Sequence, residues 1–254
     1  VPSGNKGKHG FAFVNRWYRQ HHLKTEDRIS MSRISNIDWY RHLSFAAVGG
    51  FFAAYAILLR MGIMANAQTL NLLDILLNSF EGDWLGVLMH IGALVIYIVG
   101  TMSTVFLPRL FGWDMRRVSP AVDALCAVVL AFLPAETPTV PALYPIFFAM
   151  SVQWSSFSGA QGNVSSTIFS TNNTKQAALS LARHLCAREK GQLRRMWFYV
   201  STILSFHVGA AAAYFAVELW EIKASLCALP FILWAYFMVV CEDRYCRENE
   251  SAPA

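Results

Sequence analysis

The chain has 254 residues, of which 55% are hydrophobic and only 15% are charged. Soluble domains usually carry about a quarter charged residues, so this composition argues against a soluble globular protein. The net charge of +5 would suit nucleic acid, but the basic residues lie in short segments between long apolar runs. We therefore exclude nucleic-acid binding and predict an all-α, polytopic membrane protein whose main partner is the lipid bilayer.

Residues 1–42 precede the first apolar run and contain eight of the 21 Lys and Arg residues. Phe11, Val14, Trp17 and Tyr18 follow helical spacing among these basic residues, which is typical of a helix lying in the membrane interface. The alternative is a mobile basic leader with incidental aromatic residues. The segment lacks the apolar stretch of a cleavable signal peptide, so we expect no such peptide here.

Six later runs approach the length of about 20 apolar residues that a helix needs to cross the hydrocarbon core. They cover residues 43–62, 84–107, 118–134, 141–160, 196–217 and 224–241. The third run is short and contains Asp123, which follows Pro120 and which we interpret as an early-turn residue that interacts favourably with the helix dipole. We divide the chain into residues 1–42, a membrane repeat 43–140, a second repeat 141–241 and a tail 242–254.

The basic residues alternate between the connections of these runs. The amino-terminal segment, the second and fourth connections and the tail are rich in Lys and Arg, whereas the first and third connections contain neither. The fifth connection has Lys223 beside two glutamates. Because short cytoplasmic loops carry the positive excess, we predict six spans with both termini cytoplasmic.

The two halves of the chain share an internal match. Residues 97–106 (YIVGTMSTVF) correspond to residues 206–215 (FHVGAAAAYF), and 51–54 (FFAA) correspond to 147–150 (FFAM). Repeats of three spans must enter the membrane from opposite sides, so we predict two inverted repeats. Gly100 and Gly209 occupy the same position in the match and give each middle helix a small-residue face, on which we expect these two helices to cross.

Each half also contains an almost uncharged polar segment between its first and second run. The first covers residues 64–71; in the second, 151–176, 16 of 26 residues are Ser, Thr, Asn or Gln. Such backbone survives at membrane depth only inside protein or beside a water-filled cavity, which predicts a re-entrant or broken helix in each repeat. The alternative is a polar loop outside the membrane. The candidate substrate-binding residues are Asn66, Gln68, Thr69, Asn71, Gln153, Asn163, Thr171, Asn172 and Asn173.

Four ionisable residues are candidates for proton transfer or gating, because such groups inside spans are costly and usually functional. His90 and His207 are the histidines that we expect at membrane depth, with hydrogen-bonded packing as the alternative role. Asp74 follows the first polar segment and suits cation binding or amide orientation, or else a cap. Arg60 at the end of the first span suits gating, or else snorkels to the interface.

The sequence offers no signal for metal, cofactor or enzyme chemistry. Cys241 and Cys246, five residues apart, are a weak candidate pair of metal ligands, and no other His/Cys pair in the sequence has usable ligand spacing. A phosphate-binding glycine loop, a nucleophile elbow and paired intramembrane acids are also missing from the sequence. We therefore predict no metal, no cofactor and no enzymatic activity.

The polar segments carry a resemblance to a known family. Residues 65–69 (ANAQT) followed by 81–84 (EGDW), and residues 152–154 (VQW) followed by 166–172 (STIFSTN), look like its two motifs. Over roughly residues 43–241 the chain resembles the YoaK-like family of six-span bacterial membrane proteins, known mainly as a domain of unknown function. The resemblance implies the fold and a location in a bacterial cytoplasmic (inner) membrane, but it brings no substrate. Members often have an acidic residue in the first span where this chain has Ala53, so the resemblance carries no coupling ion over to this chain.

These observations predict a small transporter or facilitator for a small polar or anionic solute, with alternating access around a midplane site between inverted repeats. The alternative is a non-catalytic accessory subunit that docks on a larger membrane complex through residues 1–42. Self-association into a homo-oligomer is the remaining partner prediction.

Overall fold

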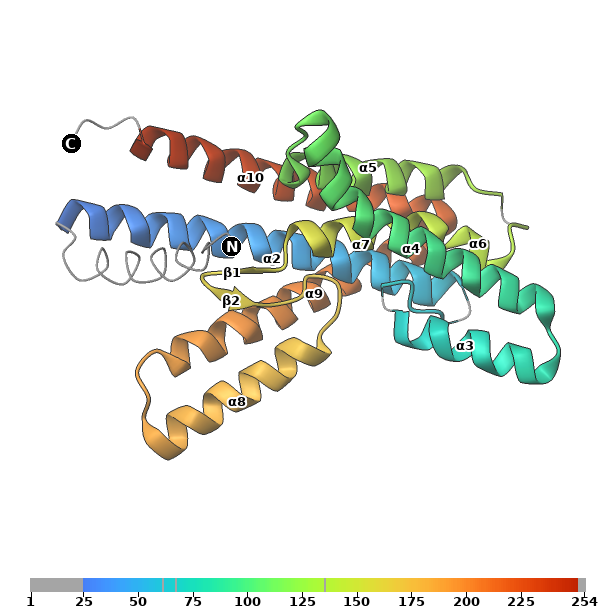
Figure 1. Cartoon of the computed structure of the whole chain (residues 1–254), viewed down its shortest axis with the longest axis horizontal. Helices are drawn as coiled ribbons and strands as arrows, with labels where there is room; N and C mark the ends of the chain where they lie inside the picture. The colour runs from blue at the N-terminus through green and yellow to red at the C-terminus, as the bar shows by residue number, and fades with distance from the viewer. Residues whose placement is uncertain (1–24, 61, 67, 135, 251–254) are drawn as a thin grey trace, which may run out of the picture.

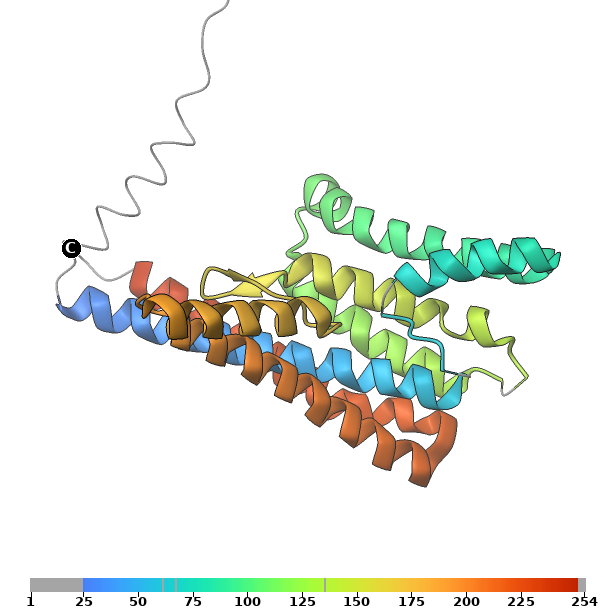
Figure 2. The ribbon, with the colours of Figure 1, turned by 90° about the horizontal axis from the view of Figure 1, so that it is seen from below.

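The computed structural model describes residues 25–60, 62–66, 68–134 and 136–250, with side chains from 36 to 248 within these ranges. Apart from a short hairpin, these residues form helices joined by short connections (Figures 1 and 2). The elements in chain order are α2 (Thr25–Leu59), α3 (Gln68–Glu81), α4 (Trp84–Phe111), α5 (Met115–Phe132), α6 (Thr139–Ala142), α7 (Tyr144–Ser156), β1 (Gly159–Ala160), β2 (Asn163–Val164), α8 (Thr171–Ala187), α9 (Gln192–Trp220), the 3₁₀ helix η1 (Glu221–Ala228) and α10 (Leu229–Glu250).

Among the described residues, three segments are long and apolar enough to cross a membrane. They are Asn36–Leu59 in α2, Trp84–Phe111 in α4, and Gln192–Glu248, which contains α9, η1 and α10. The chain is therefore a helical membrane protein by length and composition. The helices that match the third and fourth apolar runs, α5 with 18 residues and α7 with 13, are shorter.

Several helix boundaries differ from the predicted spans. α2 begins at Thr25 and continues without a break past residue 42, and α10 likewise continues past residue 242. α7 ends at Ser156, where a run expected to reach residue 160 turns into the β1–β2 hairpin. Gln161 and Gly162 at the hairpin tip both have positive φ, the conformation of a tight two-residue turn. The predicted interfacial helix with Phe11, Val14, Trp17 and Tyr18 lies outside the described residues.

α2 packs directly on α9 through glycines. A Cβ atom on Gly50 would overlap the carbonyl oxygen of Phe206, and one on Gly209 would overlap that of Ala47, so the two backbones are in contact. In α4, the corresponding glycine, Gly100, faces Phe148 and Ser151 of α7 instead. The prediction that α4 and α9 cross each other is therefore wrong: a small-residue face permits close approach but does not specify which helix approaches.

Two helical hairpins enclose the polar segments. α3 packs along α4, and α8 packs along α9. In both cases a non-helical stretch leads inward, and the helix that follows runs outward. The described residues of these stretches are 60, 62–66 and 165–170. α3 and α8 both begin near the middle of the long axis of the molecule and run towards opposite ends (Figures 1 and 2).

An ion-pair cluster joins α2, α5 and α10 beside the start of α5. Arg41 contacts Asp38 and also Glu242 at 2.7 Å, and Arg116 of α5 contacts the same glutamate. Arg117 pairs with Asp243 at 2.6 Å, and these hydrogen bonds raise the pKa of its guanidinium. Beyond this cluster, the beginning of α2 and the end of α10 extend towards the same end of the molecule (Figure 1).

Asp123 does not have the environment that the sequence suggested. It lies in the middle of α5 rather than in an early turn, its exposed fraction is 0%, and neither carboxyl oxygen has a hydrogen-bond partner among the described residues. The interpretation of Asp123 as an early-turn residue is wrong. α5 begins at Met115, before the predicted run that starts at residue 118, so Asp123 lies further along the helix than expected.

Candidate functional site

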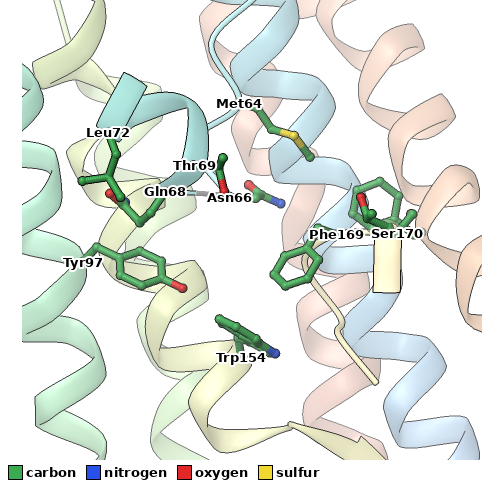
Figure 3. Close-up of a pocket in the computed structure, with 11 residues that line it drawn as sticks. Met64, Asn66, Gln68, Thr69, Leu72, Tyr97, Trp154, Phe169 and Ser170 are labelled. Carbon is green, nitrogen blue, oxygen red and sulfur yellow. The ribbon is translucent and has the colours of Figure 1, made fainter. Parts of the chain in front are cut away.

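A pocket of about 640 Å³ lies where the two polar segments meet (Figure 3). We call it the central pocket. It is lined by Met64, Asn66, Gln68, Thr69, Leu72, Tyr97, Trp154, Phe169, Ser170, Thr171 and Phe206. The lining comes from residues far apart in the chain, and four of the predicted site residues are among them: Asn66, Gln68, Thr69 and Thr171.

The amino-terminal ends of two helices face the central pocket. Gln68 and Thr69 are the first residues of α3, and Ser170 and Thr171 are the N-cap and first residue of α8. No side chain caps α8, and Ser170 Oγ is buried without a partner among the described residues. Uncapped N–H groups and the helix dipole favour negative charge at such ends. The pocket is therefore suited to an anion or to the electronegative end of a polar solute.

Asn66 ties the two polar segments to α2. Its side chain is fully buried, and its Nδ2 donates hydrogen bonds to the carbonyl oxygens of Gly49 and Ile168, each at 2.9 Å. These bonds place the irregular backbone of both segments beside one helix. Asn66 Oδ1 has no hydrogen-bond partner among the described residues, although the residue lines the pocket. A buried polar atom of this kind is a candidate contact for a solute or water.

A second polar contact leads from the central pocket to His90. Asn71 is buried, and its Nδ2 donates to Gln68 Oε1 at 2.9 Å and to the His90 carbonyl at 3.1 Å. His90 Nδ1 lies 2.8 Å from Asn71 Oδ1 and 3.9 Å from Asp74 Oδ2. Because Asn71 Nδ2 is the donor in the first two bonds, its Oδ1 accepts the proton of His90 Nδ1. Gln68, Asn71 and His90 thus form one hydrogen-bonded group, with the Asp74 carboxylate beside it.

Two further predicted residues of the second polar segment, Gln153 and Asn173, make hydrogen bonds that support the structure around it. Gln153 Nε2 donates to the Phe45 carbonyl at 3.1 Å and to Thr167 Oγ1 at 2.9 Å. Asn173 Oδ1 accepts from Ser165 Oγ at 2.9 Å, and its Nδ2 donates to the Ser166 carbonyl at 2.8 Å. Both residues are buried and do not line the pocket. Their hydrogen bonds have a structural role, since buried irregular backbone needs such partners.

The other candidates lie apart from the central pocket. Asn163 belongs to β2 and lines a different pocket near the α8–α9 turn, and Asn172 is half-buried outside the lining. Arg60 Nη1 donates to the Thr137 carbonyl at 3.3 Å. His207 is exposed on α9, with Nδ1 2.8 Å from the Ile203 carbonyl oxygen.

The histidine that is buried with the polar segments was not predicted. His42 has an exposed fraction of 0%, and its Nε2 lies 2.9 Å from Ser165 Oγ. The expectation named His90 and His207 as the histidines at membrane depth and left out His42. The basic segment 1–42 seemed to end at His42, whereas α2 carries this residue into the core.

Aromatic residues form much of the pocket wall, and sequence reasoning missed them. Figure 3 shows the Tyr97 hydroxyl directed towards the centre of the pocket, with Trp154 and Phe169 around it. The rings of Trp154 and Phe169 meet edge to face at 5.0 Å. Tyr97 and Phe206 are the first residues of the internal match, so their paired aromatic positions were an available signal.

The central pocket thus combines neutral polar groups with aromatic surface. None of its lining residues is Asp, Glu, Lys, Arg or His, and none is Cys. The arrangement offers hydrogen-bonding groups, helix ends and ring faces to a molecule of suitable size.

Comparison with known proteins places the chain in a family. One family model matches residues 42–240, most of the chain. The chain belongs to this family. It is described as "Protein of unknown function (DUF1275)", and its extent agrees with that of the resemblance found in the sequence. Neither the search of curated proteins nor the search of solved structures found a match.

Proposed function

We propose that this protein is a small transporter or facilitator that carries a small polar or anionic solute through the central pocket. The observation that carries the proposal is the approach of two oppositely directed helices, α3 and α8, with their amino-terminal ends at one pocket. Opposed broken helices around a midplane site are a recurring design of secondary transporters.

The helix packing supports two inverted three-span repeats. α2 packs on α9 as α7 packs on α4, and α10 packs on α2 as α5 packs on α7. If each span is replaced by the span at the same position in the other half, the α2–α9 pair becomes the α7–α4 pair, and the α10–α2 pair becomes the α5–α7 pair. Tyr97 and Phe206, which the internal match aligns, both line the pocket. In this proposal α2, α4, α5, α7, α9 and α10 are the six spans.

The charge distribution supports an orientation with both termini in the cytoplasm of a bacterial cell. Lys and Arg gather in the second and fourth connections and in the tail, which lie towards the side of the molecule that holds the start of α2 and the end of α10. The positive-inside rule assigns this end to the cytoplasm.

The lining supports a solute with two kinds of surface. An acceptor atom or negative charge would face the ends of α3 and α8, near Ser170, while Asn66 Oδ1 would accept a hydrogen bond. A small apolar part would contact Tyr97, Trp154 and Phe206. Because no lining residue is a carboxylate, a metal cation has no charged ligand there.

Cysteine accessibility tests alternating access without knowledge of the solute. In a variant whose five cysteines are replaced, Thr69→Cys and Thr171→Cys place a thiol at each helix end. A membrane-impermeant anionic methanethiosulfonate is applied to intact spheroplasts and to inside-out vesicles. We expect both thiols to react from both sides, because a transporter exposes its site to each side in turn.

The matched control is Thr101→Cys, at an exposed position of α4 outside the pocket lining. This thiol faces lipid in the proposal and should stay unmodified from both sides. Reaction of the two pocket thiols from one side alone, or from neither, would contradict transport and favour the accessory-subunit alternative.

A further inference from the structure

A second pocket lies beside the β1–β2 hairpin, outside the central pocket. Its volume is about 310 Å³, and it is lined by Gln161, Asn163, Lys190, Gly191, Gln192, Arg194 and Arg195. We call it the hairpin pocket. Three of its seven lining residues are cations and none is an acid. The proposed transport path does not use it.

The hairpin side of this pocket is held in place by three side chains, two from α2 and one from α9. Asp38 Oδ2 of α2 accepts the backbone N–H of Gln161 at 2.6 Å, and the Arg41 guanidinium donates to the Gly159 carbonyl at 3.4 Å. The Tyr199 hydroxyl of α9 donates to the Val164 carbonyl at 3.1 Å. The turn at Gln161 is therefore a fixed wall of the pocket.

The helix side presents positive charge. α9 begins here with Gly191 as N-cap in the left-handed conformation, with no side-chain cap for its first N–H groups. The Arg195 guanidinium lies over the Tyr199 ring at 5.9 Å, a stacking contact that limits its conformations. Its Nε is buried without a partner among the described residues, as is Gln192 Oε1.

The acid nearest in sequence is engaged with a neutral side chain. Glu189 Oε2 accepts from Gln192 Nε2 at 2.9 Å, and Glu189 is not among the lining residues. Within the described residues, neither Lys190 nor Arg195 forms an ion pair with a carboxylate. Guanidinium and ammonium groups beside an uncapped helix end are the donors that bind phosphate.

We infer that the hairpin pocket binds a phosphate group, either of an anionic lipid head or of a soluble phosphate ester. The inference uses the side chains and the helix end described above, and it does not depend on transport through the central pocket. In the proposed orientation the pocket lies at the cytoplasmic surface, where basic pockets between helices meet anionic headgroups.

Binding to the purified full chain in detergent tests this inference. The probes are short-chain phosphatidylglycerol, short-chain phosphatidylcholine and glycerol 3-phosphate, with the thermal midpoint followed against probe concentration. We expect phosphatidylglycerol or glycerol 3-phosphate to raise the midpoint saturably. Stabilisation by phosphatidylglycerol without glycerol 3-phosphate would assign a lipid headgroup, and stabilisation by both would assign the phosphate group itself.

Charge-matched variants test the location of the site. Lys190→Gln with Arg195→Gln should weaken binding roughly 30-fold, since each basic residue near anionic headgroups contributes about a factor of five. Lys175→Gln with Arg183→Gln removes the same charges from α8, outside the pocket, and should bind as the unaltered chain does. Equal weakening in both pairs, or no stabilisation by either phosphate probe, would overturn the inference.

A single substitution guards against loss of folding. Lys190→Glu leaves the Arg195–Tyr199 contact intact and reverses the charge of an exposed residue, with Lys175→Glu as its control. We expect the first to abolish the phosphate-dependent shift while the midpoint without probe stays unchanged. A full phosphate-dependent shift in Lys190→Glu would contradict the site.

Discussion

The contact between α2 and α9 makes Gly209→Ala a sensitive test of the fold. Helix propensity alone would favour alanine over glycine by about 1 kcal/mol. At this position, however, the new Cβ would overlap the carbonyl oxygen of Ala47, and a backbone atom cannot rotate away. Overpacking costs up to about 3 kcal/mol when the backbones must separate. We therefore expect a net loss of about 2 kcal/mol in the free energy of unfolding.

Two further variants set the scale. Gly100→Ala should cost less, because its new Cβ would first meet the hydroxyl of Ser151, a side chain that can change rotamer. Ala211→Gly, at an exposed position of α9, removes a methyl group without a crossing contact and should lose about 1 kcal/mol through helix propensity.

The measurement is thermal unfolding of the purified protein in detergent, followed by tryptophan fluorescence. A loss of 2 kcal/mol corresponds to a midpoint lowered by about 4–8 °C for a domain of this size. If Gly209→Ala has the same midpoint as the unaltered protein or a higher one, the close crossing of α2 and α9 is refuted.

The same unfolding assay tests two buried charges. Glu242→Gln should cost about 3–5 kcal/mol, because it leaves Arg41 without its partner on α10 in a buried position, whereas Arg117→Gln at an exposed pair should cost about 1 kcal/mol or less; equal losses would contradict the buried cluster. Asp123→Asn should leave the midpoint unchanged or raise it, because a charged carboxylate without a partner is costly to bury; a clearly lowered midpoint would show that this carboxyl group has a partner that stabilises it.

The polar segments illustrate how far the sequence could predict the candidate site. Their low charge and high amide and hydroxyl content indicated buried irregular backbone, and the central pocket does contain Asn66, Gln68, Thr69 and Thr171. The same composition could not separate residues that line the pocket from those that support it. Gln153 and Asn66 both donate from the side-chain amide to a carbonyl oxygen of α2, yet only Asn66 lines the central pocket.

The sequence also did not indicate which helices pack against each other. Gly100 and Gly209 marked two faces for close packing, but each meets a helix of the opposite half rather than the other middle helix. Aromatic residues such as Phe206 were not among the predicted site residues, although the fold brings them to the pocket. Asn163 was predicted in the substrate site, but it lines the hairpin pocket because α7 ends early and a turn follows.

Composition and periodicity by themselves determined that this chain is a helical membrane protein with two polar interruptions, because the cost of placing charge and unpaired backbone in lipid restricts the sequence at every position. The tertiary structure alone decided which polar atoms meet. It brings the beginnings of α3 and α8 to one pocket and leaves Asp123 buried without a partner among the described residues. Such contacts depend on which helices pack together, and packing between apolar faces leaves little trace in the sequence of either face.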